Sequence, residues 1–110
     1  MLRGEVHWAD LEPSVGVEAN KTRPVLIVSN NGANVAAVTH RGVVTVVPLT
    51  SSTDVVHPFQ ALVTVADRES KAQVEQLRAI SVDRLRGRIG FLDSEAMDRI
   101  DRALKVHLSL

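Results

Sequence analysis

Lys21-Thr22-Arg23-Pro24 runs directly into Val25-Leu26-Ile27-Val28. The second segment is continuous, aliphatic and largely β-branched, which is typical of a strand covered on both faces. Pro24 fixes its own φ angle and favours an extended backbone at Arg23, so the guanidinium leaves the edge of this strand in a restricted direction. An arginine held in this way can bind a phosphate through several donors, although the segment taken alone fits a solvated loop arginine better.

The rest of the chain predicts more short strands. We expect them at residues 6–8, 43–47, 59–65 and 84–89, with a loop over residues 13–22 and a turn at Asn30-Asn31-Gly32. The segment at 84–89 alternates Arg84, Arg86 and Arg88 with apolar residues or glycine, which gives a basic outer face. Residues 71–80 are ambiguous, because their apolar spacing looks helical whereas their neighbours favour strands.

The last part of the chain predicts a helix. Ser94 is a possible cap and Glu95 suits the positive end of the helix dipole. An apolar stripe at helical spacing follows, formed by Met97, Ile100, Leu104 and Leu108. Five or six strands with one terminal helix predict a mainly β, α+β fold, a small bent antiparallel sheet or barrel, as one domain over residues 1–110.

Composition limits the function. The 110 residues are 45% apolar, and 13 lysines and arginines balance 13 aspartates and glutamates, so nucleic-acid binding must depend on local patches. The absence of cysteine excludes disulfides and thiolate metal sites and fits a reducing cytoplasm. The early charges exclude a signal peptide, and no apolar run is long enough to span a bilayer. We therefore expect a cytoplasmic protein.

Most catalytic patterns are missing. The four histidines are scattered without metal-ligand spacing, so neither a metal nor a cofactor is expected; a two-histidine nuclease could arise only by tertiary convergence. Arg23 and Thr50, however, each lie at the end of a predicted buried strand, and Glu18 precedes Arg23 on the same loop. A guanidinium, a hydroxyl and a carboxylate suit RNA cleavage by the RNA's own 2′-hydroxyl, because they can bind the phosphate and accept a proton. The alternatives are an ordinary Ser/Thr turn at Thr50 and a solvated carboxylate at Glu18.

A family resemblance extends from about Arg3 to Leu108. It rests on Gly4-Glu5-Val6-His7-Trp8, Pro13, Gly16 with Glu18, Arg23-Pro24-Val25-Leu26-Ile27-Val28-Ser29, Asn34, Val47-Pro48-Leu49-Thr50-Ser51, Pro58-Phe59, Glu75-Gln76-Leu77-Arg78, Ile89-Gly90 and the helix from Met97 to Leu104. Because these motifs occur in this order and with this spacing, the chain resembles the MazF/PemK toxins of bacterial toxin–antitoxin pairs.

The resemblance implies an SH3-like barrel of the MazF/Kid/CcdB plasmid-maintenance-toxin type that forms a homodimer. It implies metal-independent, sequence-specific cleavage of single-stranded RNA to a 2′,3′-cyclic phosphate and a 5′-hydroxyl, blocked by a cognate MazE-like antitoxin. Arg23, Thr50 and Glu18 fall on the family's catalytic positions, and residues 71–80 become largely strand. We expect RNA contacts from Asn20, Lys21, Ser51, Ser52, Gln76 and Arg78.

The chain departs from the family pattern at Val17, at Ala79 and in a short connection after Val65, which affects sequence preference more than reaction class. The arginine stripe is either a solvated face or a contact for RNA or an acidic antitoxin. Two other functions stay open: a CcdB-type gyrase poison and a silent dimer that only titrates antitoxin. The last residues, Leu108-Ser109-Leu110, differ from the Trp-Gly-Ile tail of gyrase poisons, and retention of Arg23 and Thr50 disfavours both alternatives.

Overall fold

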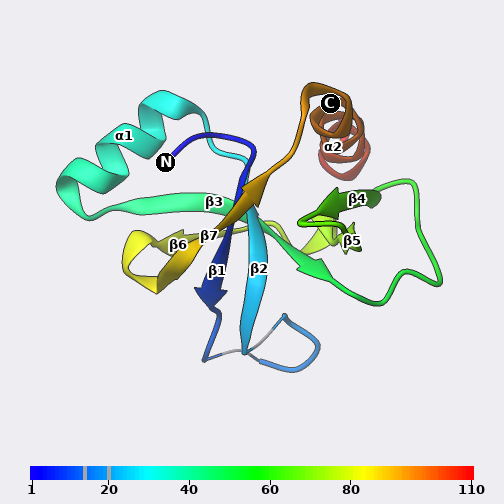
Figure 1. Ribbon diagram of the computed structural model, residues 1–110, viewed down its shortest axis with the longest axis horizontal. Coiled ribbons are helices and arrows are strands. Elements are labelled where there is room, and N and C mark those ends of the chain that lie inside the picture. Colours follow the sequence, from blue (N-terminus) through cyan, green and yellow to red (C-terminus); the bar gives the residue numbers. More distant parts are fainter. Residues whose placement is uncertain (14, 20) are drawn as a thin grey trace.

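The computed structural model describes residues 1–13, 15–19 and 21–110. The strands are β1 (Glu5–Asp10), β2 (Thr22–Ile27), β3 (Val43–Thr50), β4 (Ala61–Val65), β5 (Arg68–Ala72), β6 (Arg78–Ser81) and β7 (Leu85–Phe91). The helices are α1 (Asn31–His40), α2 (Ser94–Leu108) and the single-turn 3₁₀ helices η1 (Val74–Gln76) and η2 (Val82–Arg84). Figure 1 shows a curled sheet with α1 and α2 over separate parts of it, and the β1–β2 loop projects away from both.

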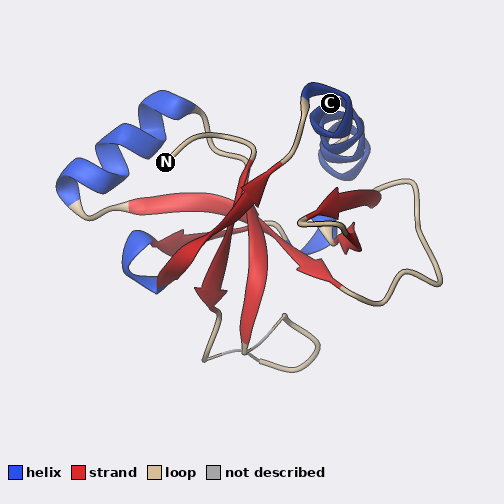
Figure 2. Cartoon of the chain, in the orientation of Figure 1, coloured by secondary structure: helices blue, strands red, loops and turns tan. Residues whose placement is uncertain are grey.

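All strand pairs are antiparallel, and β3 is the central strand. One edge of β3 pairs with β2, from Val25↔Pro48 to Ile27↔Val46. Its other edge pairs first with β6, over Val43–Val46, and then with β5, at Leu49 and Thr50. Two successive partners along one edge require β3 to bend, which curls the strands into a barrel-like sheet (Figure 2). The predicted α+β fold with a C-terminal helix is therefore confirmed.

Two apolar clusters lie on opposite faces of β2 and β3. Leu26 and Val47 belong to one cluster, which α2 covers with Ile100, whereas Val25 and Val46 belong to the other. Each of these side chains is fully buried. Successive residues of a strand point to opposite faces, so an uninterrupted aliphatic run is needed to fill both clusters. This explains why the two continuous runs were correctly predicted to be buried strands.

Helix α1 was missed, because Asn30-Asn31-Gly32 was predicted to be a turn. Asn30 instead caps α1, and its side-chain carbonyl accepts a hydrogen bond from the backbone N–H of Ala33 at 2.8 Å. The same residue types serve both turns and helix caps, since each needs a short polar side chain that bonds to the backbone. The side chain of the fully buried Asn34 then anchors the first turn of α1 to Ser29.

Three further expectations need correction. The described chain has seven strands where five or six were expected. Residues 71–80 are strand at both ends but form the single turn η1 in the middle, so the segment is strand only in part. Asp93, and not Ser94, caps α2 by accepting the N–H of Ala96 at 2.9 Å, and Leu108 at the end of the predicted stripe is 47% exposed.

Candidate active site

Arg23 and Thr50 come together where β2 begins and β3 ends. The β2–β3 pairing reaches Val25↔Pro48, two residues after Arg23 on β2 and two residues before Thr50 on β3. Both residues line one groove of about 280 Å³, and both are partly buried. The expected convergence of these two strand ends is therefore present in the structure, while their catalytic roles remain a prediction.

The groove combines apolar and polar walls. Trp8, Pro24 and Leu49 contribute apolar surface, and the β4–β5 hairpin adds Arg68 and Ser70. Trp8 also lines this groove and is 44% exposed, which was not predicted from the sequence. Alternation along β1 was the available signal, because it places Trp8 on the same face as the buried Val6. An exposed indole beside cations suits the stacking of an unpaired base.

The end of β3 presents hydroxyl groups in a defined turn. The Thr50 hydroxyl oxygen accepts the N–H of Ser52 at 3.3 Å, so the Thr50 hydroxyl proton can still be donated to a ligand oxygen. The Ser52 hydroxyl donates to Asp54 at 2.9 Å, and this bond holds the pKa of Asp54 below its usual value. Ser51 lines the groove with Thr50.

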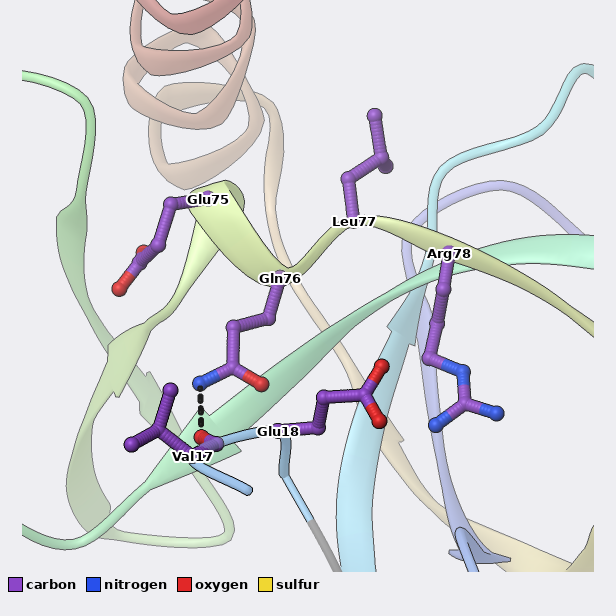
Figure 3. Close-up of a pocket in the computed structure, with 6 residues that line it drawn as sticks. All are labelled: Val17, Glu18, Glu75, Gln76, Leu77 and Arg78. Atoms are coloured by element: carbon purple, nitrogen blue, oxygen red, sulfur yellow. Dashed lines mark hydrogen bonds between the residues drawn. The ribbon is translucent and has the colours of Figure 1, made fainter. Parts of the chain in front are cut away.

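Glu18 lies in a second pocket and not in the Arg23–Thr50 groove. This pocket, of about 630 Å³, is lined by Val17, Glu18, Glu75, Gln76, Leu77 and Arg78. Figure 3 shows Glu18 and Arg78 reaching into it from the β1–β2 loop and from β6. One carboxylate oxygen of Glu18 accepts the N–H of Val15 at 2.6 Å, so the side chain is folded against its own loop.

The two pockets are related through β3. Arg78 is in register with Val46, and paired residues project from the same face of a sheet. Thr50 lies four residues beyond Val46 on the same strand, so alternation directs it to that face too. The structure thus places the predicted site residues in two pockets, with Arg23 and Thr50 in one and Glu18, Gln76 and Arg78 in the other.

The remaining predicted RNA contacts vary in position. Lys21 is exposed beside Arg23 and has a positive φ of 63°. Asn20 lies outside the described residues. Gln76 is already engaged: its amide oxygen accepts the N–H of Ala19 at 2.5 Å, and its amide nitrogen donates to the carbonyl of Val17 at 3.4 Å (Figure 3).

The arginine stripe is mainly structural. Arg84 donates to the carbonyls of Asp10, at 3.1 Å, and Glu12, and so holds the start of the β1–β2 loop. Arg86 donates to the carbonyl of Asp83 at 2.5 Å. Arg88 lies 5.5 Å from the ring centre of Phe91. Arg86 and Arg88 are exposed, as expected of a solvated face, whereas the bonds of Arg84 to the carbonyls of Asp10 and Glu12 were not anticipated.

The described residues contain neither a metal-binding cluster nor a membrane-spanning helix. Within residues 1–13, 15–19 and 21–110, no group of three or more histidine, aspartate and glutamate side chains is arranged to hold a metal ion. None of the helices in this described part is both long and apolar enough to cross a membrane.

The sequence matches the PemK-like, MazF-like toxins of type II toxin–antitoxin systems over residues 2–108. The chain belongs to this toxin family. It is 44% identical to endoribonuclease MazF9 of Mycobacterium tuberculosis over 115 residues, which cover 100% of this chain and 98% of the relative. It is 36% identical to endoribonuclease EndoA of Bacillus subtilis, with 98% and 94% covered. The predicted family is therefore confirmed, and the names of both relatives agree with the predicted enzyme class.

Solved structures agree with the MazF-type fold. A mycobacterial endoribonuclease in complex with its cognate antitoxin superposes with a TM-score of 0.78 at 28% identity, covering 100% of this chain and 96% of that one. MazF of Deinococcus radiodurans superposes with a TM-score of 0.84 at 18% identity, covering 100% and 97%. The second likeness concerns the fold alone.

Proposed function

We propose that this MazF-type toxin is an endoribonuclease that cleaves single-stranded RNA through attack of the RNA's own 2′-hydroxyl. The convergence of Arg23 and Thr50 on one groove carries the proposal. A guanidinium supplies several N–H donors in a plane and a hydroxyl supplies one more, which suits a phosphate that gains negative charge as it becomes five-coordinate. The chemistry needs no metal ion, because protein donors stabilise that charge.

The proposed step forms one bond and breaks another. The 2′-oxygen bonds to phosphorus, the bond from phosphorus to the 5′-oxygen breaks, and the products are a 2′,3′-cyclic phosphate and a 5′-hydroxyl. Glu18 accepts the 2′-hydroxyl proton and water supplies a proton to the 5′-oxygen. Arg23 and Thr50 donate hydrogen bonds to the phosphate oxygens. Because Glu18 lines the second pocket, the bound RNA must bring its 2′-hydroxyl within hydrogen-bond reach of Glu18 while Arg23 and Thr50 hold the adjacent phosphate.

Further contacts would hold the RNA. Lys21 and Arg78 would bind phosphates, the exposed Ser51 hydroxyl would donate a hydrogen bond to the strand, and the Ser52 hydroxyl, which donates to Asp54, would accept one. Asn20 remains a predicted contact. We also propose that the toxin forms a homodimer in the cytoplasm and is blocked by a MazE-like antitoxin. Structures of relatives with their antitoxins support this last partner.

The decisive experiment incubates the purified toxin with total RNA and maps the new 5′ ends by their chemistry. We expect 5′-hydroxyl ends at a recurrent short sequence. A synthetic RNA with this sequence is then compared with a matched strand that has a single 2′-deoxy sugar at the cleavage position. We expect only the first to be cut; 5′-phosphate ends, or equal cleavage of the deoxy strand, would contradict the mechanism.

A further inference from the structure

Gln76 bonds to the backbone on both sides of Glu18. Its amide oxygen accepts the N–H of Ala19 at 2.5 Å, and its amide nitrogen donates to the carbonyl of Val17 at 3.4 Å. Figure 3 shows the Gln76 side chain extending from η1 to the loop beside Glu18. The two bonds use both ends of one amide, so they fix the position and the orientation of the peptide units that flank Glu18.

Other contacts hold the tip and the stem of the loop. At the tip, the Glu18 N–H donates to the carbonyl of Val15 at 3.2 Å, and the Glu18 carboxylate accepts the N–H of Val15 at 2.6 Å. The stem is closed by the bond from Leu11 N–H to the carbonyl of Lys21, at 2.9 Å, and by the Glu12 carboxylate, which accepts the N–H of Lys21 at 2.8 Å. Near the tip, Ala19 is buried in a core cluster but Val17 is 96% exposed. Among the described residues, core packing holds Ala19, the bonds with Val15 hold Glu18 to its own loop, and Gln76 joins both neighbours of Glu18 to η1.

Gln76 is itself tied to the strand that carries Thr50. The N–H of Gln73 donates to the carbonyl of Pro48 at 2.9 Å, two residues before Thr50 on β3. The N–H of Gln76 then donates to the carbonyl of Gln73 at 2.9 Å, which forms the single turn of η1. Val74 within this turn is fully buried. A continuous series of bonds thus links the end of β3 to the loop around Glu18.

We infer that Gln76 is a positioning residue, which holds Glu18 at a fixed place relative to Thr50 through the backbone of Val17 and Ala19. The inference rests on the proposed function, since it gives Glu18 the role of base. A proton acceptor must lie within hydrogen-bond reach of the 2′-hydroxyl, and a displacement of about 1 Å can reduce a rate about 100-fold. Both ends of the Gln76 amide are already bonded, so this role differs from the direct RNA contact predicted from the sequence.

A double-mutant cycle of Gln76→Ala and Glu18→Gln tests the inference on the mapped RNA. We expect Gln76→Ala to lower kcat by about 10- to 100-fold, while affinity for the uncleavable 2′-deoxy RNA stays within twofold of the wild type. In the Glu18→Gln background, Gln76→Ala should cause no further loss, because residues that act as one unit are not additive. Gln76→Glu keeps the acceptor for Ala19 N–H and should lose less, and it replaces Gln76→Ala if that variant does not fold.

Amide hydrogen exchange at Ala19 separates failure of this inference from failure of the proposed base. We expect faster exchange at Ala19 in Gln76→Ala and unchanged exchange in Glu18→Gln. Unchanged exchange at Ala19 in Gln76→Ala would mean that the Gln76 side chain does not hold the backbone of Ala19, which would overturn the inference. Weaker binding of the deoxy RNA with additive losses in the cycle would instead make Gln76 a direct RNA contact. If Glu18→Gln is fully active while Gln76→Ala is slow, Glu18 is not the base. Gln76 then cannot act by positioning Glu18, and both proposals are overturned.

Discussion

Arg23→Ala should separate catalysis from stability. Arg23 is the second residue of β2, and its backbone pairs with Ala9 of β1. The substitution removes the side chain beyond Cβ and leaves this pairing in place. A partly buried side chain at the edge of a strand is outside the core clusters, so we expect the free energy of unfolding to change by less than about 1 kcal/mol.

The expected catalytic effect is much larger. Loss of one preorganised donor to a developing oxyanion costs about 2.7–4 kcal/mol, which is a factor of about 100–1,000 in rate. The assay is single-turnover cleavage of the mapped RNA, with thermal unfolding measured on the same preparations. Lys21→Ala is the matched control, because it removes one positive charge from an exposed position two residues before Arg23. Arg23→Lys keeps the charge but loses the planar fork, so its rate should lie between those of the wild type and Arg23→Ala.

Two results would refute this reasoning. Cleavage by Arg23→Ala within about threefold of the wild type would mean that the guanidinium does not stabilise the transition state. If Arg23→Ala and Lys21→Ala lower the cleavage rate equally, and both losses shrink as the salt concentration rises, both residues act only by electrostatic attraction of the RNA. A specific phosphate contact predicts instead that the difference between these two variants persists at high salt.

Four further outcomes follow from the structure. Thr50→Val should lower the cleavage rate about 10- to 100-fold, because valine lacks the hydroxyl that donates to the phosphate. Thr50→Ser keeps this hydroxyl and should retain most of the rate. Equal rates for the two variants in the RNA assay would contradict this role. EDTA should leave the cleavage rate unchanged, and loss of activity on chelation would indicate a metal nuclease. Burial alone would raise the pKa of Glu5, but its hydrogen bond with His7 at 2.9 Å and nearby positive charges hold that pKa below its usual value. This stabilisation is present above the unfolded pKa of about 4.3 and is lost as pH falls through the folded pKa, so Glu5→Gln should lower the urea midpoint more at pH 7 than at pH 3; an equal effect at both would refute the assignment. Ile100→Ala should cost about 2–5 kcal/mol of unfolding free energy, since Ile100 is fully buried between α2 and the sheet, and a loss below 1 kcal/mol in urea titration would contradict that packing.

The central strands could be predicted because a strand buried on both faces has apolar residues at consecutive positions. In β2, Val25 and Leu26 fill different core clusters, so the sequence shows an aliphatic run with no polar break. Helix α1 has no comparable local signal. Its first turn depends on Asn34, whose side chain bonds to both the carbonyl and the hydroxyl of Ser29, and its Val35 and Val38 remain exposed. A helix without a clean apolar stripe, preceded by residues that also suit turns, is decided by tertiary contacts.

The same distinction divides the candidate site. Arg23 and Thr50 could be paired from the sequence, because adjacent antiparallel strands bring the start of one beside the end of the other. The position of Glu18 could not, since it depends on a hydrogen bond between Ala19 and Gln76, which are 57 residues apart. That bond in turn depends on η1, the segment whose helical spacing was set aside in favour of a strand. A fully extended segment there would lose the turn that joins Gln76 to Gln73, and with it the connection from β3 to the Glu18 loop. The placement of the proposed base therefore depends on the irregular turn η1 between β5 and β6, and a change confined to the Gln76 side chain should alter catalysis more than the fold.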